Sequence, residues 1–183
     1  MNDYIIYGGA FNPPTIGHYK IIEYLLNKFD NKLIILPTNN YYKSNEIVSF
    51  EHRKEMINLM LEKYSDRIIV SDYEQTLDKY YGTYYTLKHF EHPLFVIGAD
   101  SLDTIHQWIN YPNVVKENKF IVFPRDGVNI EESKVYKKYK KHFIICDDFI
   151  ENDISSTNFR KNKDKSLVTE EVYLYICNNK LYL

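Results

Sequence analysis

The sequence has little of what marks disulfide-stabilised, secreted or membrane-spanning proteins. Its 183 residues include 2 cysteines, Cys146 and Cys177, which form no CxxC pair. Both lie in apolar surroundings, which predicts buried, inert thiols and fits a reducing compartment. No apolar run approaches the roughly 20 residues that a membrane span needs, and the acidic start at residues 1–3 predicts no secretory signal. We therefore expect a cytoplasmic protein without a membrane partner.

An excess of one charge and clusters of metal-binding side chains are also missing. The formal net charge is −2, so the chain as a whole is not drawn to nucleic acid, and no nucleic-acid partner is predicted. One basic run, residues 134–141, follows Glu131 and Glu132. We interpret it as a solvated helix or loop, with a surface for an acidic partner as the alternative. The histidines beyond residue 18 show no metal-ligand spacing, so no protein-bound metal site is expected.

Six nearly continuous apolar runs predict strands that are covered on both faces, as in a parallel sheet. They are residues 4–7, 33–36, 68–70, 94–97, 120–123 and 143–146. Helical patterns lie between them, and this alternation predicts an α/β fold with a doubly wound parallel sheet. No repeat or linker interrupts the chain, so residues 1–183 are predicted to form a single domain. Residues 126–139 are the least structured by pattern.

Four helices are predicted from their apolar faces and capping residues. The first follows His18 and buries Ile21, Ile22, Leu25, Leu26 and Phe29; the second is capped by Ser49 and carries a stripe of Met56, Leu59, Met60 and Lys63; the third covers residues 83–90; the fourth is capped by Thr169 and buries Val172, Tyr175 and Ile176. Ligands of such sheets bind at the carboxyl ends of the strands, which directs attention to the segments that follow them.

The segment from Gly8 to His18 carries the strongest chemical signal. Two glycines directly follow the first predicted strand, and Gly17-His18 opens a helix. Glycines let a backbone approach a phosphate closely, and the start of a helix offers unpaired N–H groups and the positive end of its dipole. His18 can add a further donor to the same oxyanion. A glycine pair alone often marks only a tight turn, but the full segment predicts a phosphate site.

The segment resembles the (H/T)xGH signature of the nucleotidyltransferase superfamily, whose loop often reads GGxFDPxHxGH. Thr15 stands at the first His of that signature, as in phosphopantetheine adenylyltransferases, and Asn12 and Ala10 are further departures. The resemblance implies a Rossmann-like nucleotidyltransferase fold. It also implies that His18 and Thr15 hold phosphate oxygens, and that ATP lies along the residues Gly8, Gly9, Ala10, Phe11 and Gly17.

A second segment, Ile154 to Arg160, resembles the ISSTxIR motif of the same superfamily. Ser155 can cap a helix, and an ordinary Ser/Thr cap is the alternative interpretation of this segment. The resemblance assigns Ser155, Ser156 and Thr157 to the ATP polyphosphate, and Arg160 to catalysis as a cation with a planar fork of donors. It therefore gives the C-terminal helical part, residues 155–183, a share of the active site.

A third segment separates families within the superfamily. Residues 97–101 read IGADS after a predicted strand, and Trp108 lies 8 positions beyond Asp100. This resembles the IGxDS…W block of bacterial nicotinate mononucleotide adenylyltransferases. The resemblance places Gly98 and Asp100 beside the ATP ribose and stacks Trp108 on the pyridine ring of the acceptor. A core tryptophan is the alternative.

Weaker matches to the same family cover most of the remaining chain. Thr83 matches a stretch that contacts the pyridine carboxylate, although Gly82 stands in place of its tyrosine. Asn39 and Lys43 fall in a loop that is implied to bind the acceptor, with Lys43 at a position that is usually histidine. The tail from Val172 to Tyr182 resembles the family's VxxYIxxNxLY ending.

The resemblance therefore implies a nicotinate-nucleotide adenylyltransferase of NAD biosynthesis, with ATP and nicotinate mononucleotide as substrates and Mg²⁺ carried by ATP. Direct in-line transfer without a covalent intermediate is expected. Nicotinamide mononucleotide or phosphopantetheine as the acceptor, and an inactive nucleotide-binding sensor, remain alternatives. The oligomeric state is open, with a homo-oligomer among the alternatives.

Overall fold

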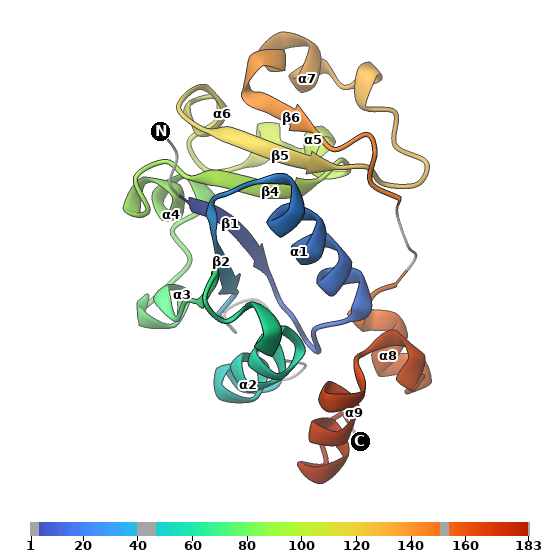
Figure 1. The fold of residues 1–183 in the computed structure, drawn as a ribbon. Helices are drawn as coiled ribbons and strands as arrows, with labels where there is room; N and C mark the ends of the chain where they lie inside the picture. Colours follow the sequence, from blue (N-terminus) through green and yellow to red (C-terminus); the bar gives the residue numbers. More distant parts are fainter. Residues whose placement is uncertain (1–3, 40–46, 151–153, 183) are drawn as a thin grey trace. The chain divides into compact units, whose positions relative to one another are not determined.

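A computed structural model describes residues 4–39, 47–150 and 154–182. Its six strands form a parallel sheet with the order β3-β2-β1-β4-β5-β6. The strand order changes direction at β1 and β4, as in a doubly wound α/β sheet. The predicted fold class is therefore confirmed, and all six strands lie where the apolar runs place them (Figure 1).

The chain divides into two compact units, each of which is discontinuous in sequence. Unit 1 comprises residues 1–7 and 79–151. Its strands are the first part of β1 (Tyr4–Gly9), β4 (Leu94–Gly98), β5 (Lys119–Phe123) and β6 (Phe143–Ile145), and its helices are α4 (Thr83–His89), α5 (Ser101–Thr104), α6 (Asn113–Lys116) and α7 (Lys134–Tyr139). Short 3-10 helices add η3 (Ile105–Gln107), η4 (Ile130–Glu132) and η5 (Lys140–His142). Residues 120–123 of β5 are all buried, which makes this strand the centre of the unit's core.

Unit 2 comprises residues 8–78 and 152–183. It holds β2 (Lys32–Pro37), β3 (Ile68–Val70), α1 (Ile16–Lys28), α2 (Phe50–Leu61), η2 (Glu62–Tyr64), α3 (Tyr73–Thr76), α8 (Ser156–Asn162), η6 (Lys165–Leu167) and α9 (Glu170–Asn178). Helices α2 and α9 pack against each other. That the whole chain acts as one nucleotidyltransferase domain stays a prediction.

The four predicted helices are confirmed, with corrections to three of their buried faces. Phe29 follows α1 and is only half-buried, and Tyr175 of α9 is also only half-buried. Helix α1 buries the predicted isoleucines and leucines, and Ser49 caps α2 by accepting a hydrogen bond from the His52 N–H. The buried face of α2 consists of Arg53, Met56, Ile57, Met60 and Leu61. Leu59 is only half-buried and Lys63 lies beyond the helix, in η2, so the predicted stripe was partly wrong.

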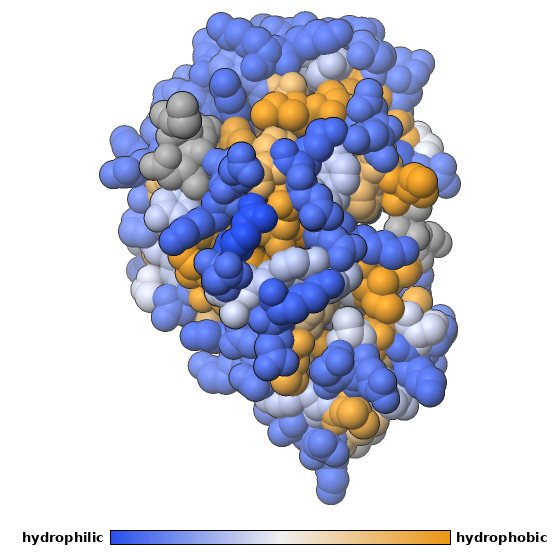
Figure 2. Space-filling view, viewed as in Figure 1, coloured by the Kyte–Doolittle hydropathy of each residue, from blue (hydrophilic) through white to orange (hydrophobic). Residues whose placement is uncertain are grey.

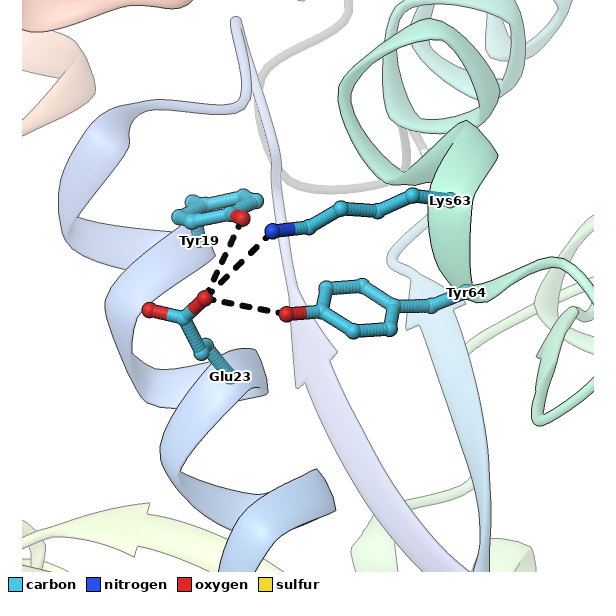
Figure 3. Close-up of polar contacts among 4 residues, drawn as sticks. All are labelled: Tyr19, Glu23, Lys63 and Tyr64. Carbon is cyan, nitrogen blue, oxygen red and sulfur yellow. Dashed lines mark hydrogen bonds and ion pairs between the residues drawn. The ribbon is translucent and has the colours of Figure 1, made fainter.

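Lys63 belongs to a polar cluster that joins η2 to α1 (Figure 3). Glu23 Oε1 accepts hydrogen bonds from the hydroxyls of Tyr64 (2.9 Å) and Tyr19 (3.3 Å), and Lys63 Nζ lies 3.5 Å from it. The ammonium also lies over the rings of Tyr19 and Tyr64. The Tyr64 hydroxyl is the largest of the causes that lower the pKa of the Glu23 carboxyl. The cluster therefore joins α1 to η2, the segment that follows α2.

Two further predictions need correction. Residues 126–139 contain η4 and α7, regular structure that the sequence pattern did not show. Ser133 caps helix α7 by accepting from the Tyr136 N–H (3.3 Å). This helix buries Val135, Tyr136 and Tyr139, but its exposed lysines hide that short apolar face in the sequence. Cys146 is buried as predicted, whereas Cys177 is exposed, because it lies off the α9 face that buries Val172 and Ile176.

The face of the molecule drawn in Figure 2 is largely polar. Figure 2 shows hydrophilic side chains over most of the visible face, with hydrophobic ones between them. In the described part of the chain, no helix is long and apolar enough to cross a membrane.

Candidate functional site

The segment from Gly8 to His18 leaves the end of β1 and enters α1 within unit 2. Its backbone is held to the neighbouring strand, because the Gly9 carbonyl accepts a hydrogen bond from the Thr38 N–H (2.9 Å). Phe11 is buried and adopts a positive φ of 48°, and its ring centroid lies 4.9 Å from that of His18. Gly8 and Gly9 are half-buried and Ala10 is exposed, so the polypeptide backbone is accessible along the first half of this loop.

His18 occupies the third position of α1, and Thr15 is the residue that caps this helix. The Thr15 N–H donates to His18 Nδ1 at 3.0 Å, and the Thr15 hydroxyl lies 2.8 Å from the same nitrogen. The two predicted phosphate ligands are thus brought together. Their exposures differ, since Thr15 is 0% exposed while His18 is half-buried.

Two buried polar side chains hold the same loop in place: Arg53 of α2 and Asn12 of the loop itself. Arg53 is 0% exposed and donates to the Ala10 carbonyl at 2.8 Å. Asn12 Oδ1 accepts from the Tyr182 hydroxyl at 2.8 Å and from the Val48 N–H at 3.2 Å. Burial lowers the pKa of the Arg53 guanidinium and raises that of the Tyr182 phenol. Moving the loop would break these hydrogen bonds and leave buried polar groups unpaired. The free-energy cost of an unpaired group exceeds the contribution of the bond itself, so we expect the loop to have little freedom to move.

The Ile154–Arg160 segment lies directly against this loop. Ser155 caps α8 by accepting from the Asn158 N–H, as predicted. Ser156 Oγ donates to the Pro13 carbonyl at 2.7 Å, and Arg160 Nη1 donates to the Asn12 carbonyl at 2.6 Å. The structure therefore brings together the two motifs that the sequence separates by more than 130 residues.

Gly17 explains how closely the two segments approach. A Cβ atom at this position would lie 2.9 Å from the Ile154 carbonyl oxygen, which is closer than real side chains come to a backbone. A larger residue at position 17 would therefore push the second motif away from the start of α1. Thr157 is exposed on the first turn of α8, and its hydroxyl accepts from Arg160 Nη2 at 3.3 Å.

In unit 1, the end of β4 places Gly98 and Asp100 beside a residue that the sequence did not indicate. Arg125 Nε lies 3.6 Å from Asp100 Oδ1, and a Cβ at Gly98 would lie 2.8 Å from the same Nε and would meet the Asp100 carboxylate. Only glycine at position 98 leaves room for the Asp100–Arg125 ion pair at the end of β4. Arg125 follows β5 by two residues. The sequence could have indicated Arg125 by its position just after β5, a strand that pairs with β4.

Unit 1 also brings the segments of Thr83 and Trp108 together. Gly82 has φ of 98°, and a Cβ there would lie 2.8 Å from Ile109, the neighbour of Trp108. Glycine therefore replaces the family's tyrosine at position 82 for a local reason. Any side chain there would strain the backbone and would clash with Ile109. Trp108 is half-buried and meets Phe95 and Phe120 edge to face, each at 6.5 Å between centroids. The indole therefore packs against two core rings while part of its surface stays accessible to solvent.

Two predicted acceptor contacts, Asn39 and Lys43, follow β2 in the sequence. Asn39 is half-buried, and its side-chain amide donates to the Glu74 carbonyl at 2.9 Å. Lys43 lies outside the described residues.

No group of three or more His, Cys, Asp or Glu side chains within residues 4–39, 47–150 and 154–182 is arranged to hold a metal ion. The donors that unit 2 collects are instead backbone amides, hydroxyls, an imidazole and a guanidinium. These groups recognise phosphate oxygens. A preorganised set of them can bind a polyphosphate and stabilise charge that develops on it.

The comparisons with known proteins agree with this chemistry. Residues 6–162 match the cytidylyltransferase-like family. The chain is 36% identical over 189 residues to a probable nicotinate-nucleotide adenylyltransferase of Acholeplasma laidlawii, covering 97% of this chain and 96% of that protein. It is 33% identical to the protein of the same description from Clostridium tetani, over 100% of both chains.

A solved structure shows the same fold at lower identity. The nicotinic acid mononucleotide adenylyltransferase of Plasmodium falciparum, determined in complex with APC, superimposes with a TM-score of 0.84 at 24% identity, over 100% of this chain and 98% of that one. The same protein has been solved with NaAD. Because the sequence matches extend over nearly the whole length of the relatives, this chain belongs to the cytidylyltransferase-like family and, within it, to the nicotinate-nucleotide adenylyltransferases.

Proposed function

We propose that this chain transfers the adenylyl group of ATP to nicotinate mononucleotide, giving deamido-NAD and pyrophosphate. The observation that carries the proposal is the assembly, within unit 2, of the glycine loop, His18 and the Ser155–Arg160 motif. The full-length similarity to nicotinate-nucleotide adenylyltransferases supports the choice of acceptor.

The reaction is a direct displacement at phosphorus. An oxygen of the acceptor's 5′-phosphate attacks the α-phosphorus of ATP, and the new P–O bond forms as the bond to pyrophosphate breaks. A phosphate is already a competent nucleophile, so neither a general base nor a covalent enzyme intermediate is needed. Catalysis then consists of positioning the two phosphates in line and stabilising the charge that passes to pyrophosphate.

The ATP side is assigned to residues around the glycine loop and the end of β4. His18 contacts the phosphates directly, with Thr15 behind it, and Arg160 receives the departing pyrophosphate together with the start of α8. A guanidinium has five N–H donors, more than its two bonds to Asn12 and Thr157 require. The remaining ATP contacts are assigned to Gly8, Gly9, Ala10, Phe11, Gly17, Gly98, Asp100, Ser155, Ser156 and Thr157.

The acceptor side is assigned to Trp108, Thr83, Asn39 and Lys43. A half-buried indole that is braced edge to face by two phenylalanines offers a rigid face to a pyridine ring. Thr83 comes from the segment next to it, and its hydroxyl lies 3.3 Å from that of Tyr80. This arrangement supports recognition of a pyridine nucleotide.

Mg²⁺ would enter on the triphosphate of ATP, where it neutralises the charge of the phosphate oxygens. The described side chains offer no carboxylate cluster of their own to hold it. We further propose a cytoplasmic location for the enzyme and leave a homo-oligomer as the alternative to a monomer.

The test is pyrophosphate release from ATP and Mg²⁺ with each acceptor in turn. We expect turnover with nicotinate mononucleotide, and much weaker turnover with nicotinamide mononucleotide or phosphopantetheine. Preference for either of these would overturn the acceptor while keeping the chemistry. ATP binding without turnover on any acceptor would favour an inactive sensor instead.

His18→Ala links this activity to the proposed site. Losing one preorganised donor to a charged oxygen should lower turnover by roughly 10²–10³-fold. His142→Ala is the matched control, since that imidazole bonds a backbone carbonyl elsewhere in the fold. If both purified variants keep normal turnover, His18 has no part in the reaction.

A further inference from the structure

The contacts of His18 Nδ1 define which of its ring nitrogens carries the proton. One partner is the main-chain N–H of Thr15, 3.0 Å away. A main-chain amide can only donate, so Nδ1 must be the acceptor and cannot itself carry a hydrogen. A neutral imidazole has one N–H, which then resides on Nε2.

The second partner of the same nitrogen strengthens this assignment. The Thr15 hydroxyl lies 2.8 Å from Nδ1, and with Nδ1 unprotonated the hydroxyl can only donate to it. Two donors therefore point at one lone pair. On the opposite tautomer, with hydrogen on Nδ1, the main-chain N–H would face another N–H at hydrogen-bond distance, which is repulsive.

Burial keeps the Thr15 hydroxyl away from solvent. Its side chain is 0% exposed, so its hydroxyl is enclosed by protein, while the ring of His18 is half-buried. Phe11, which is also buried, packs its ring against the imidazole with an angle of 46° between the planes. The imidazole is thus held by Thr15 at one nitrogen and by Phe11 against its ring.

We propose that Thr15 is a positioning residue that fixes the tautomer of His18, so that Nε2–H is the donor offered to a phosphate oxygen. With the other tautomer, Nε2 would present a lone pair to the anion and repel it. Thr15 would then contribute to catalysis through His18 without contacting ATP. The effect on catalysis rests on the proposed function, whereas the tautomer of His18 follows from the contacts of Nδ1 alone.

The direct experiment is nitrogen-15 NMR of the wild-type protein labelled at histidine, without substrates and at about pH 8, where an ordinary imidazole is neutral. The His18 signals are assigned by their loss in His18→Gln. We expect Nδ1 to show the shift of an unprotonated ring nitrogen and Nε2 that of a protonated one. The reverse assignment in wild type would overturn the proposal, whatever the enzyme's activity.

Two variants then separate the hydroxyl from the shape of the side chain. Thr15→Val keeps the branched shape and the main-chain N–H but removes the hydroxyl, and Thr15→Ser keeps the hydroxyl. Because Thr15→Val keeps the main-chain N–H that donates to Nδ1, we expect the ring signals to move only part of the way toward the other tautomer. We expect kcat to fall by roughly tenfold, with little change in the KM for the acceptor. Thr15→Ser should resemble wild type in both measurements.

If Thr15→Val and Thr15→Ser have the same ring signals and the same kcat, Thr15 is only a helix cap. Should Thr15→Val not fold, the wild-type spectrum and the Thr15→Ser variant still decide the tautomer. A wild-type protein with the expected tautomer but no adenylyl transfer to any acceptor would refute the proposed function and leave the assignment of His18 in place.

Discussion

Arg160 contacts the glycine loop and is also proposed to bind pyrophosphate. It donates to the Asn12 carbonyl at 2.6 Å, and its further donors are assigned to pyrophosphate. Arg160→Ala should weaken ATP binding by roughly 10–150-fold, which corresponds to about 1.5–3 kcal/mol for a hydrogen bond to a charged group. Arg160→Lys should recover only part of this, because an ammonium lacks the planar fork. Calorimetric titration with ATP measures the effect.

The neighbouring Lys161 is exposed on the same helix and gives the control, since Lys161→Ala should leave ATP binding nearly unchanged. Titration with nicotinate mononucleotide should give similar affinities for wild type and both variants. Equal losses for ATP and for the acceptor in Arg160→Ala would contradict the assignment of Arg160 to the ATP side.

At the residue scale, Trp108 is proposed to select the acceptor. Stacking of a base on an aromatic ring is worth about 1–3 kcal/mol, so Trp108→Ala should lower acceptor affinity by roughly 5–150-fold. Trp108→Phe keeps an aromatic face and should retain much of the affinity. ATP affinity should change little in either variant, and separate titrations with the two substrates measure this.

Trp108→Ala also removes the edge-to-face contacts with Phe95 and Phe120, so the thermal stability of the variants should be measured together with their affinities. Truncating a large core side chain typically costs ~3–5 kcal/mol, and a half-buried one should cost less. If Trp108→Ala melts far below Trp108→Phe and both substrates lose affinity together, the indole is a core residue and does not select the acceptor.

At the scale of elements, the segment after α9 stabilises the glycine loop through one hydroxyl. Tyr182 donates to Asn12 Oδ1 at 2.8 Å, and its ring meets Phe159 of α8 edge to face. Tyr182→Phe removes the hydroxyl but keeps the ring. We expect it to cost about 1 kcal/mol of stability, which lowers Tm by roughly 2–4 °C in a chain of this size.

Tyr85→Phe serves as the control for this thermal melt, because the Tyr85 side chain is 48% exposed. Its Tm should match that of wild type. A Tyr182→Phe variant that melts with wild type would show that the Tyr182 hydroxyl contributes nothing to the loop.

The cluster of Tyr19, Glu23, Lys63 and Tyr64 links η2 to α1 and depends on the charge of Glu23 (Figure 3). Its side chain is 40% exposed, so solvent screens the interaction, and Glu23→Gln should cost less than about 1 kcal/mol at neutral pH. Glu62→Gln, at an exposed residue beside the cluster, should cost nothing measurable.

The pH dependence of that loss has a definite sign. The pKa of Glu23 is lowered in the folded protein, chiefly by the Tyr64 hydroxyl. Its contribution to stability is therefore complete above the unfolded pKa of about 4.3 and disappears as pH falls through the folded pKa. The difference in Tm between wild type and Glu23→Gln should shrink as pH falls below about 4. A difference that stays constant as pH falls below that range would exclude an ionic origin.

At the scale of the whole molecule, the fold was predictable because the inner strands β2, β4 and β5 are buried on both faces, and the edge strands β3 and β6 are also apolar although they expose Ile69 and Ile144. Such strands appear as continuous apolar runs, and all six were found with their ends within two residues. The helices with three or more turns showed their period. Helices of a single turn, such as α5 and α6, have no room for a period, and α7 hides three buried residues among lysines.

The two motifs proposed to bind phosphate could also be recognised in the sequence, because their glycines, helix starts and hydroxyls stand next to one another in the chain. Tertiary structure alone decided what those side chains touch. Thr15 faces His18 Nδ1, Ser156 and Arg160 hold the loop's carbonyls, and Arg125 pairs with Asp100. These pairings join residues by distance and burial, which depend on how the elements pack and leave no local pattern in the sequence.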